Sequence, residues 1–228
     1  MHSLLSQRRQ ILTSLLMLLA LLWHIPAAHS APPVILVFGD SLSAEYGLKR
    51  GSGWVSLMQD RLKQKGFPHR IVNASISGET TAGGAARLGA VLKKHRPELV
   101  VLELGGNDGL RGLPIAQTRA NLKSMATMAT QSGAKTLIVG IQIPPNYGPD
   151  YARQFGQLFE SVGQELRLPV VPFLLEGIAD NPNMFQADEI HPNEQAQPTM
   201  LNHVWTALIS HRLLESGNAR GNTARAQP

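Results

Sequence analysis

The sequence predicts an α/β fold of three layers, with helices on both faces of a central, mostly parallel five-stranded sheet of the flavodoxin-like kind. Short apolar runs rich in β-branched residues alternate along the chain with longer amphipathic runs, and this alternation is typical of a doubly wound sheet. The short runs are apolar at successive positions, so both faces of each strand are expected to be buried, as in a parallel sheet.

Each element follows from its own local pattern. The segments with the strand pattern are 34–38, 70–74, 99–104, 136–141 and 170–173. The segments with helical periodicity are 54–65, 80–95, 114–131, 151–166 and 194–214. Gly66 and Gly133 follow two of these helices where a C′ glycine is favoured, and Pro114 suits a first helical turn. Because ligands bind beyond the carboxyl ends of the strands in such a sheet, polar residues at those ends are candidates for a site.

The two ends of the chain are expected to lie outside the folded domain. Residues 1–30 have the pattern of a cleavable signal peptide, since Arg8 and Arg9 precede an apolar run and small residues follow it. The alternative is an uncleaved membrane anchor, but the apolar run is shorter than the roughly 20 residues that cross a bilayer. We therefore expect a periplasmic or secreted protein without a stable membrane anchor, with one domain over 31–216 and a disordered tail over 217–228.

Composition excludes some classes of protein. The chain contains no cysteine, so an exported domain must be stabilised by its core without disulfides. The formal net charge is +5 and aromatic residues make up 5% of the chain. A nucleic-acid-binding protein would be expected to have a basic stripe with aromatic stacking partners, so no nucleic-acid partner is expected. No large apolar surface stripe is evident, which favours a monomer.

Ser41 is the candidate nucleophile. It follows the first strand in the segment Gly-Asp-Ser-Leu-Ser, where a serine is exposed and close to backbone N–H donors. A serine in such a place also commonly caps a helix, so this alternative stays open. The motif is not Gly-x-Ser-x-Gly, and the nucleophile elbow of the α/β-hydrolase fold is not indicated.

Hydrogen-bond donors follow the second and third strands. Gly78 allows a close approach to the backbone and leaves its N–H available, although Thr80 could simply cap the next helix. Asn107 follows two glycines and carries a side-chain NH₂ group that can stabilise an oxyanion, although an ordinary Asn-Asp-Gly turn is the alternative.

An acid–base pair stands near the carboxyl end of the chain. Asp188 precedes His191 by three residues, so its carboxylate can accept the Nδ1–H of the imidazole and leave Nε2 free as a base. A turn leading into the last helix and a pair of metal ligands are the competing interpretations. The metal-ligand interpretation is weak because no second His or carboxylate cluster lies nearby in the sequence.

With these four segments the sequence resembles the SGNH (GDSL) hydrolases. The matching words are Gly-Asp-Ser-Leu-Ser-Ala at 39–44, Asn-Ala-Ser-Ile-Ser-Gly at 73–78, Glu-Leu-Gly-Gly-Asn-Asp-Gly-Leu-Arg-Gly at 103–112 and Ile-His-Pro-Asn at 190–193. Two shorter words, Pro-Asn-Tyr-Gly at 145–148 and Gln-Pro at 197–198, match as well. The match spans roughly 34–214. One departure is Glu45, which stands where these enzymes more often carry a small residue, and which could repel anionic substrates or point to solvent.

The resemblance implies both an activity and a set of site residues. It implies a serine hydrolase that cleaves carboxylic esters and thioesters of acyl chains, including lysophospholipids, through an acyl-enzyme and without metal or organic cofactor. The implied catalytic residues are Ser41, Asp188 and His191. The implied oxyanion hole consists of Ser41, Gly78 and Asn107. The implied substrate-binding residues are Leu42, Gly106 and Ile143, with 142–148 as a flexible wall.

Two other functions remain open at this point. A carbohydrate O-deacetylase would use the same chemistry but would be expected to have polar and aromatic sugar platforms, whereas the sequence offers Ile143, Phe155 and Phe185 near the site. A non-catalytic binding protein would be expected to have lost one of the reacting groups, and none is missing from the sequence.

Overall fold

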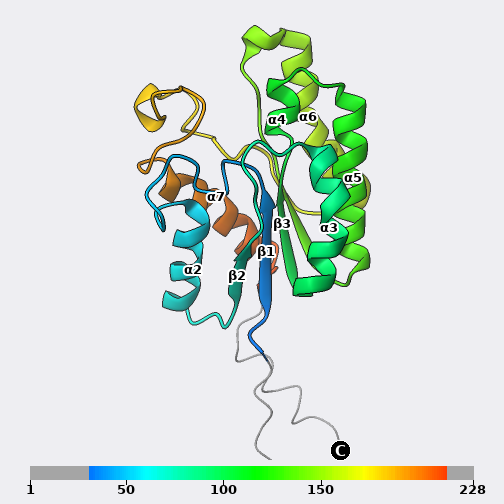
Figure 1. Ribbon diagram of the computed structural model, residues 1–228, viewed down its shortest axis with the longest axis vertical. Helices are drawn as coiled ribbons and strands as arrows, with labels where there is room; N and C mark the ends of the chain where they lie inside the picture. The colour runs from blue at the N-terminus through cyan, green and yellow to red at the C-terminus, as the bar shows by residue number, and fades with distance from the viewer. Residues whose placement is uncertain (1–30, 215–228) are drawn as a thin grey trace, which may run out of the picture. The chain divides into compact units, whose positions relative to one another are not determined.

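A computed structural model describes residues 31–214. The expected signal peptide over 1–30 and the whole of the expected tail over 217–228 lie outside these residues. The elements in chain order are β1 (Val34–Gly39), α2 (Trp54–Gln64), β2 (Arg70–Asn73), α3 (Thr81–His95), β3 (Leu99–Glu103), α4 (Gly106–Leu110), α5 (Ile115–Gln131), β4 (Lys135–Val139), η1 (Pro145–Tyr147), α6 (Pro149–Leu166), β5 (Val170–Val171), η2 (Pro182–Met184) and α7 (Gln197–Ser210) (Figure 1).

The five strands form one parallel sheet in the order β2-β1-β3-β4-β5. Val37 of β1 pairs with Asn73 of β2 on one side and with Val101 of β3 on the other. Every residue of β1 and β3 is buried, which is why their sequences are almost continuously apolar. The predicted fold class is confirmed. From β1 the chain moves to β2 at one edge of the sheet, and from β3 it moves through β4 to β5 at the other edge. Sheets of this kind bind ligands where the strand order reverses in this way, here between β1 and β3.

Helices cover both faces of this sheet. In Figure 1, α2 and α7 lie together on one side, and α3, α5 and α6 lie on the other. Trp54 at the start of α2 is fully buried and donates its indole N–H to the Leu42 carbonyl at 3.1 Å. A core residue of the α2 layer therefore fixes the backbone that directly follows Ser41.

Several boundaries differ from the sequence prediction for local reasons. The strand expected over 170–173 is Val170–Val171, because Pro169 and Pro172 flank it and proline cannot donate to the ladder. The helix expected over 194–214 is Gln197–Ser210, with Pro198 in its first turn. The short helix Gly106–Leu110 was not predicted because two of its five residues are glycine.

Two of the three predicted helix-boundary residues, Gly66 and Gly133, are confirmed, whereas Pro114 is the N-cap of α5 and precedes its first turn. Thr80 caps α3 by accepting the Gly83 N–H at 3.4 Å, and Gly66 and Gly133 have φ values of 73° and 87° just after α2 and α5. No helix between residues 31 and 214 has the length and apolar character needed to span a membrane.

Candidate active site

A large cleft opens at the carboxyl edge of the sheet. Its volume is 1180 Å³, somewhat above the size typical of small-molecule sites. Leu42, Gly106 and Ile143 all line it, together with Ser41, Asn107 and His191. Most of the rest of its apolar lining comes from two stretches, 141–152 and 173–185, which follow β4 and β5, and Leu110 and Ile190 also contribute. The further apolar residues in the two stretches are Ile141, Pro144, Pro145, Pro149, Ala152, Phe173, Leu175, Ala179, Pro182 and Phe185.

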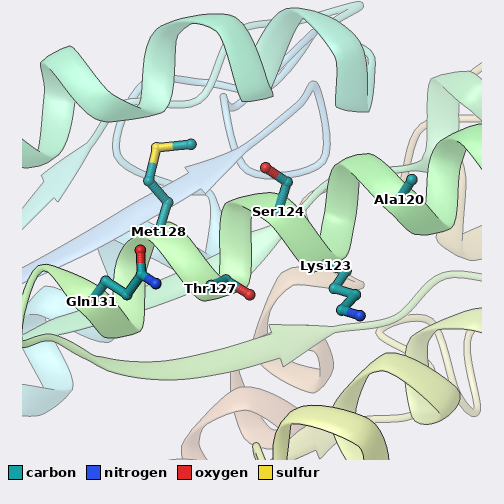
Figure 2. A pocket seen from close by; sticks show the side chains of 6 residues that line it. All are labelled: Ala120, Lys123, Ser124, Thr127, Met128 and Gln131. Carbon is teal, nitrogen blue, oxygen red and sulfur yellow. The ribbon is translucent and has the colours of Figure 1, made fainter.

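A second hollow lies far from these residues and has a different character. It is a shallow depression of 420 Å³ on α5, lined by Ala120, Lys123, Ser124, Thr127, Met128 and Gln131 (Figure 2). All six belong to a single helix, and none was singled out from the sequence. Across residues 31–214, no three or more His, Asp or Glu side chains are grouped so that they could hold a metal ion.

Ser41, His191 and Asp188 form a continuous hydrogen-bonded chain. His191 Nε2 lies 3.0 Å from Ser41 Oγ, and His191 Nδ1 lies 2.7 Å from Asp188 Oδ2. Ser41 occupies a turn and begins no helix, so the helix-cap alternative for this residue does not hold. The arrangement has the order and atom pairing of a Ser-His-Asp triad.

The loop before α7 holds Asp188 in place. Asp188 Oδ1 accepts the backbone N–H groups of Ile190 and His191, each at 3.0 Å, and Glu189 has a left-handed φ of 59°. Partial burial raises the pKa of Asp188, but these two N–H groups and the imidazole outweigh it and bring the pKa down to about 2. Asp188 is therefore ionised at any pH at which a neutral imidazole can act as a base.

The resemblance assigns the backbone N–H groups of Ser41 and Gly78 to an oxyanion hole, and both are free to donate to an oxyanion in the described part of the chain. Among residues 31–214, neither the Ser41 N–H nor the Gly78 N–H donates a hydrogen bond to a protein acceptor. Gly78 has a φ of 79°, which a side chain would strain. Its loop is fixed to β1, because Gly39 donates to Ser75 Oγ at 3.0 Å and accepts from the Ile76 N–H at 3.0 Å.

The Asn107 side chain, in the segment after β3, contacts the neighbours of both Ser41 and Gly78. Gly105, with a φ of 132°, makes the turn that starts α4 directly after the strand. The Asn107 Nδ2 donates to Asp40 Oδ2 and to the Glu79 carbonyl, both at 3.1 Å. The amide is thus oriented by two acceptors, the Asp40 carboxyl and the Glu79 carbonyl.

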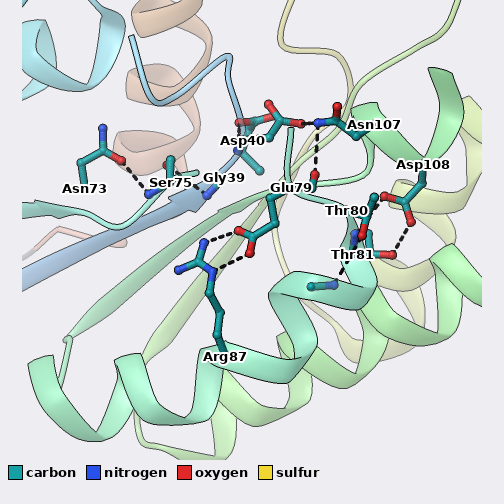
Figure 3. A network of polar contacts seen from close by, with 12 residues as sticks. Gly39, Asp40, Asn73, Ser75, Glu79, Thr80, Thr81, Arg87, Asn107 and Asp108 are labelled. Carbon is teal, nitrogen blue, oxygen red and sulfur yellow. Dashed lines mark hydrogen bonds and ion pairs between the residues drawn. The ribbon is translucent and has the colours of Figure 1, made fainter. Parts of the chain in front are cut away.

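Polar contacts join the start of α3, which follows Gly78 in the chain, to α4 (Figure 3). The buried Asp108 accepts the Thr81 N–H at 2.8 Å and the Thr81 hydroxyl at 2.5 Å. Glu79 forms an ion pair with Arg87, whose guanidinium lies 3.9 Å from the Phe38 ring centroid. The two donors Gly78 and Asn107 therefore belong to segments that are fastened to each other and to β1.

Two buried carboxyl groups lie next to the nucleophile. Glu103 Oε2 accepts the Ser43 hydroxyl at 2.7 Å, and Asp40 Oδ1 accepts the Leu42 N–H at 3.0 Å. Burial raises the pKa of Asp40 from 3.8 to about 6, against the hydrogen bonds from Leu42 and Asn107. Burial, together with the charge of Asp40, also raises the pKa of Glu103. The proximity of these two carboxyl groups was not predicted, because residues 63 positions apart leave no local pattern in the sequence.

An Asp40→Asn variant is expected to gain stability relative to the wild type as the pH rises. The folded wild type holds its Asp40 proton up to about pH 6, whereas the unfolded chain releases it near 3.8. The free energy of unfolding of the wild type therefore falls between these pH values, and the neutral amide lacks this dependence. The full shift corresponds to about 3 kcal/mol. Urea unfolding of both proteins at about pH 4 and about pH 7 measures it, and an equal stability difference at both pH values would contradict the prediction.

Two expectations about individual side chains are corrected by the structure. Glu45 neither faces the substrate cleft nor points freely to solvent: its carboxylate accepts the N–H groups of Gly51 and Gly53 and the Ser56 hydroxyl. Phe155, expected among the residues that favour acyl chains near the site, lies in α6 and is fully buried. It supports the cleft from below without lining it.

The profile of the GDSL-like Lipase/Acylhydrolase family matches residues 37–197. The chain belongs to this family. The matched region contains Ser41, His191 and Asp188, which are joined by hydrogen bonds. Membership of this family agrees with the resemblance found in the sequence.

The relatives of this acylhydrolase include proteins named as esterases, a thioesterase and a lysophospholipase. Esterase TesA of Pseudomonas aeruginosa is 52% identical over 179 residues, which cover 78% of this chain and 89% of that protein. Thioesterase 1/protease 1/lysophospholipase L1 of Escherichia coli K12 is 39% identical over 184 residues, covering 77% and 87%. The solved structure of the psychrotrophic esterase EstA from Pseudoalteromonas sp., inhibited by monoethylphosphonate, has a TM-score of 0.74 at 38% identity, covering 78% and 97%. The acylhydrolase is therefore an ester-cleaving enzyme of the serine hydrolase type.

Proposed function

We propose that the protein is an exported serine hydrolase that cleaves carboxylic ester and thioester bonds of acyl-chain substrates, lysophospholipids among them. The observation that carries the proposal is the pair of contacts on one imidazole, 3.0 Å to Ser41 Oγ and 2.7 Å to Asp188, inside an apolar cleft. Export rests on the residues over 1–30, which lie outside the described part of the chain. We expect it to act as a monomer.

The proposed reaction begins with proton transfer. His191 Nε2 takes the proton of Ser41 as Oγ attacks the carbonyl carbon, and Asp188 stabilises the imidazolium that forms. The tetrahedral oxygen accepts the N–H groups of Ser41 and Gly78. Asn107 contributes an N–H that it shares with Asp40 in the resting protein. The tetrahedral species collapses as the bond to the leaving oxygen or sulfur breaks, and His191 gives its proton to the departing alcohol or thiol. Water, activated by the same base, then hydrolyses the acyl-enzyme.

The cleft lining supports an acyl chain as the group that is bound. Ile, Leu, Pro and Phe side chains line much of it, alongside charged residues such as Arg153, Glu176 and Asp180, and no Trp or Tyr is among its lining residues. A sugar platform would be expected to present Trp or Tyr together with convergent polar groups. An acyl chain gains about 0.8 kcal/mol for each methylene that it buries, so an apolar cleft of this size favours medium and long chains.

Hydrolysis of p-nitrophenyl esters from C2 to C16 by the chain that begins at Ala31 tests the proposal. Activity that peaks at medium or long chains and disappears in Ser41→Ala supports both the serine mechanism and the acyl cleft. Activity confined to the acetate would favour the deacetylase. Equal rates in both proteins would overturn the proposal.

A Pro145→Gly variant is expected to change chain-length preference more than turnover of a short ester. Pro145 lines the cleft in η1, with Pro144 before it and Gly148 after it, and replacing a fixed φ by a glycine loosens this wall. We expect kcat/KM for a C12 ester to fall by about 3-fold or more and that for the acetate to change by less than about 2-fold. A chain-length profile identical to that of the wild type would contradict the prediction.

A further inference from the structure

An exposed tyrosine covers the face of the histidine in the candidate triad. The rings of Tyr46 and His191 lie 4.4 Å apart between centroids, tilted by 37°, although Tyr46 is 49% exposed. The two hydrogen bonds of His191, to Ser41 and to Asp188, leave from nearly opposite edges of the imidazole. Two such bonds fix an axis but allow the ring to rock about it. A ring packed on one face limits that rocking.

The backbone on either side of Tyr46 is fastened tightly. Glu45 has a left-handed φ of 59°, a conformation that persists only where the surroundings impose it. Its carboxylate supplies that constraint, because it accepts the Gly51 N–H at 3.1 Å, the Gly53 N–H at 2.9 Å and the Ser56 hydroxyl at 2.7 Å. Glu45 thus ties the segment that carries Tyr46 to the start of α2.

A second residue joins this segment to the loop of His191. Gln186 donates its side-chain N–H groups to the Tyr46 carbonyl at 2.9 Å and to the Pro192 carbonyl at 3.2 Å, and its backbone N–H to the His191 carbonyl at 2.8 Å. Gly47 is close enough to Gln186 that a Cβ there would lie 2.0 Å from its Oε1. The two loops therefore form one hydrogen-bonded unit with the ring contact at its centre.

We propose that Tyr46 is a positioning residue for catalysis, which holds the His191 imidazole in line with Ser41, and that Glu45 fixes the backbone that carries it. This role rests on the proposed serine mechanism. The ring also faces the imidazolium that forms when His191 accepts the serine proton, and an aromatic face attracts a cation. The interaction is therefore stronger after proton transfer than before it, which is the condition for a contribution to kcat.

Kinetics of p-nitrophenyl butyrate hydrolysis by Tyr46→Ala and Tyr46→Phe test the proposal in the chain that begins at Ala31. Tyr46→Ala is expected to lower kcat about 3- to 10-fold with KM unchanged. Tyr46→Phe, which keeps the ring face, is expected to retain the kcat of the wild type. Ile209→Ala is the matched control, since Ile209 is 45% exposed near the end of α7, and it should leave both constants unchanged.

Three outcomes would overturn the positioning role. Loss of kcat in Tyr46→Phe equal to that in Tyr46→Ala would assign the effect to the hydroxyl. A raised KM with unchanged kcat would make Tyr46 a substrate contact. If Tyr46→Ala hydrolyses the ester as fast as the wild type while Ser41→Ala is inactive, the positioning role of Tyr46 is overturned and the proposed function stands. If Ser41→Ala is still active, the proposed function is overturned as well.

A double-mutant cycle tests the part played by Glu45. Because Glu45 is proposed to act through Tyr46, Glu45→Ala should lower kcat, and the Glu45→Ala/Tyr46→Ala double variant should lose no more than Tyr46→Ala does. Additive losses in the cycle would show that Glu45 acts independently of the ring and would overturn this part of the proposal.

Discussion

Replacing Ser41 by alanine is expected to lower kcat for p-nitrophenyl esters by about 10⁴- to 10⁶-fold. The variant keeps the cleft and the N–H donors of the proposed oxyanion hole, but it has no nucleophile at the position 3.0 Å from His191 Nε2. The residual rate should come from binding and from the N–H donors alone. Single-turnover and steady-state assays of the same ester series measure the loss.

Covalent labelling provides an independent readout of the same residue. An alkyl phosphonate with a good leaving group should add the mass of its phosphonyl group to the wild type and not to Ser41→Ala, because the serine oxygen displaces the leaving group and becomes phosphonylated. Ser210→Ala is a suitable control, since the Ser210 hydroxyl only contacts the Ala207 carbonyl in α7. Labelling of Ser41→Ala to the same extent as the wild type would place the nucleophile elsewhere.

An Asp188→Asn variant is expected to lower kcat by about 10⁴-fold. The asparagine oxygen can still accept the backbone N–H groups of Ile190 and His191, so its NH₂ group turns toward the imidazole Nδ1. Nδ1 must then act as an acceptor, and the proton moves to Nε2, where it blocks acceptance of the serine proton. Steady-state kinetics with a short and a long ester measure the effect.

The matched control for this change is Asp60→Asn. Asp60 is an exposed carboxylate of α2 whose ion-pair partner among residues 31–214 is Lys63 at 3.8 Å, so its replacement should leave kcat and KM unchanged. A similar kcat for Asp188→Asn and the wild type would show that the carboxylate orients nothing, and the triad would then reduce to Ser41 and His191.

The fold could be predicted because its central strands β1 and β3 are buried on both faces, although the edge strand β2 is not. The almost uninterrupted apolar sequence of β1 and β3 matches their complete burial, and parallel strands connected by helices follow from that pattern. The helix and strand boundaries that were predicted wrongly lie where local sequence propensity and the structure disagree. The Gly-rich α4 forms because Gly105 adopts a φ of 132° after β3, which no helix propensity reveals.

The reacting groups of the candidate site could be predicted, but their surroundings could not. Ser41, Asn107 and His191 follow strands or precede the last helix, so the topology brings them to one edge. The contact between Ser41 and His191 joins residues 150 positions apart. The contacts of Tyr46 with His191 and of Ser43 with Glu103 also join segments far apart in the sequence, and they depend on loop conformations that leave no periodic trace in it.

The division of the cleft between separate stretches of chain has a consequence for how such an enzyme can diversify. The groups proposed to react follow β1, β2 and β3 or lie just before α7, whereas much of the apolar wall comes from 141–152, directly after β4. Substitutions in that stretch can therefore alter which acyl chain is accepted while the hydrogen bonds around Ser41 stay intact. Laboratory evolution of new substrate ranges should draw its successful variants mainly from this one stretch.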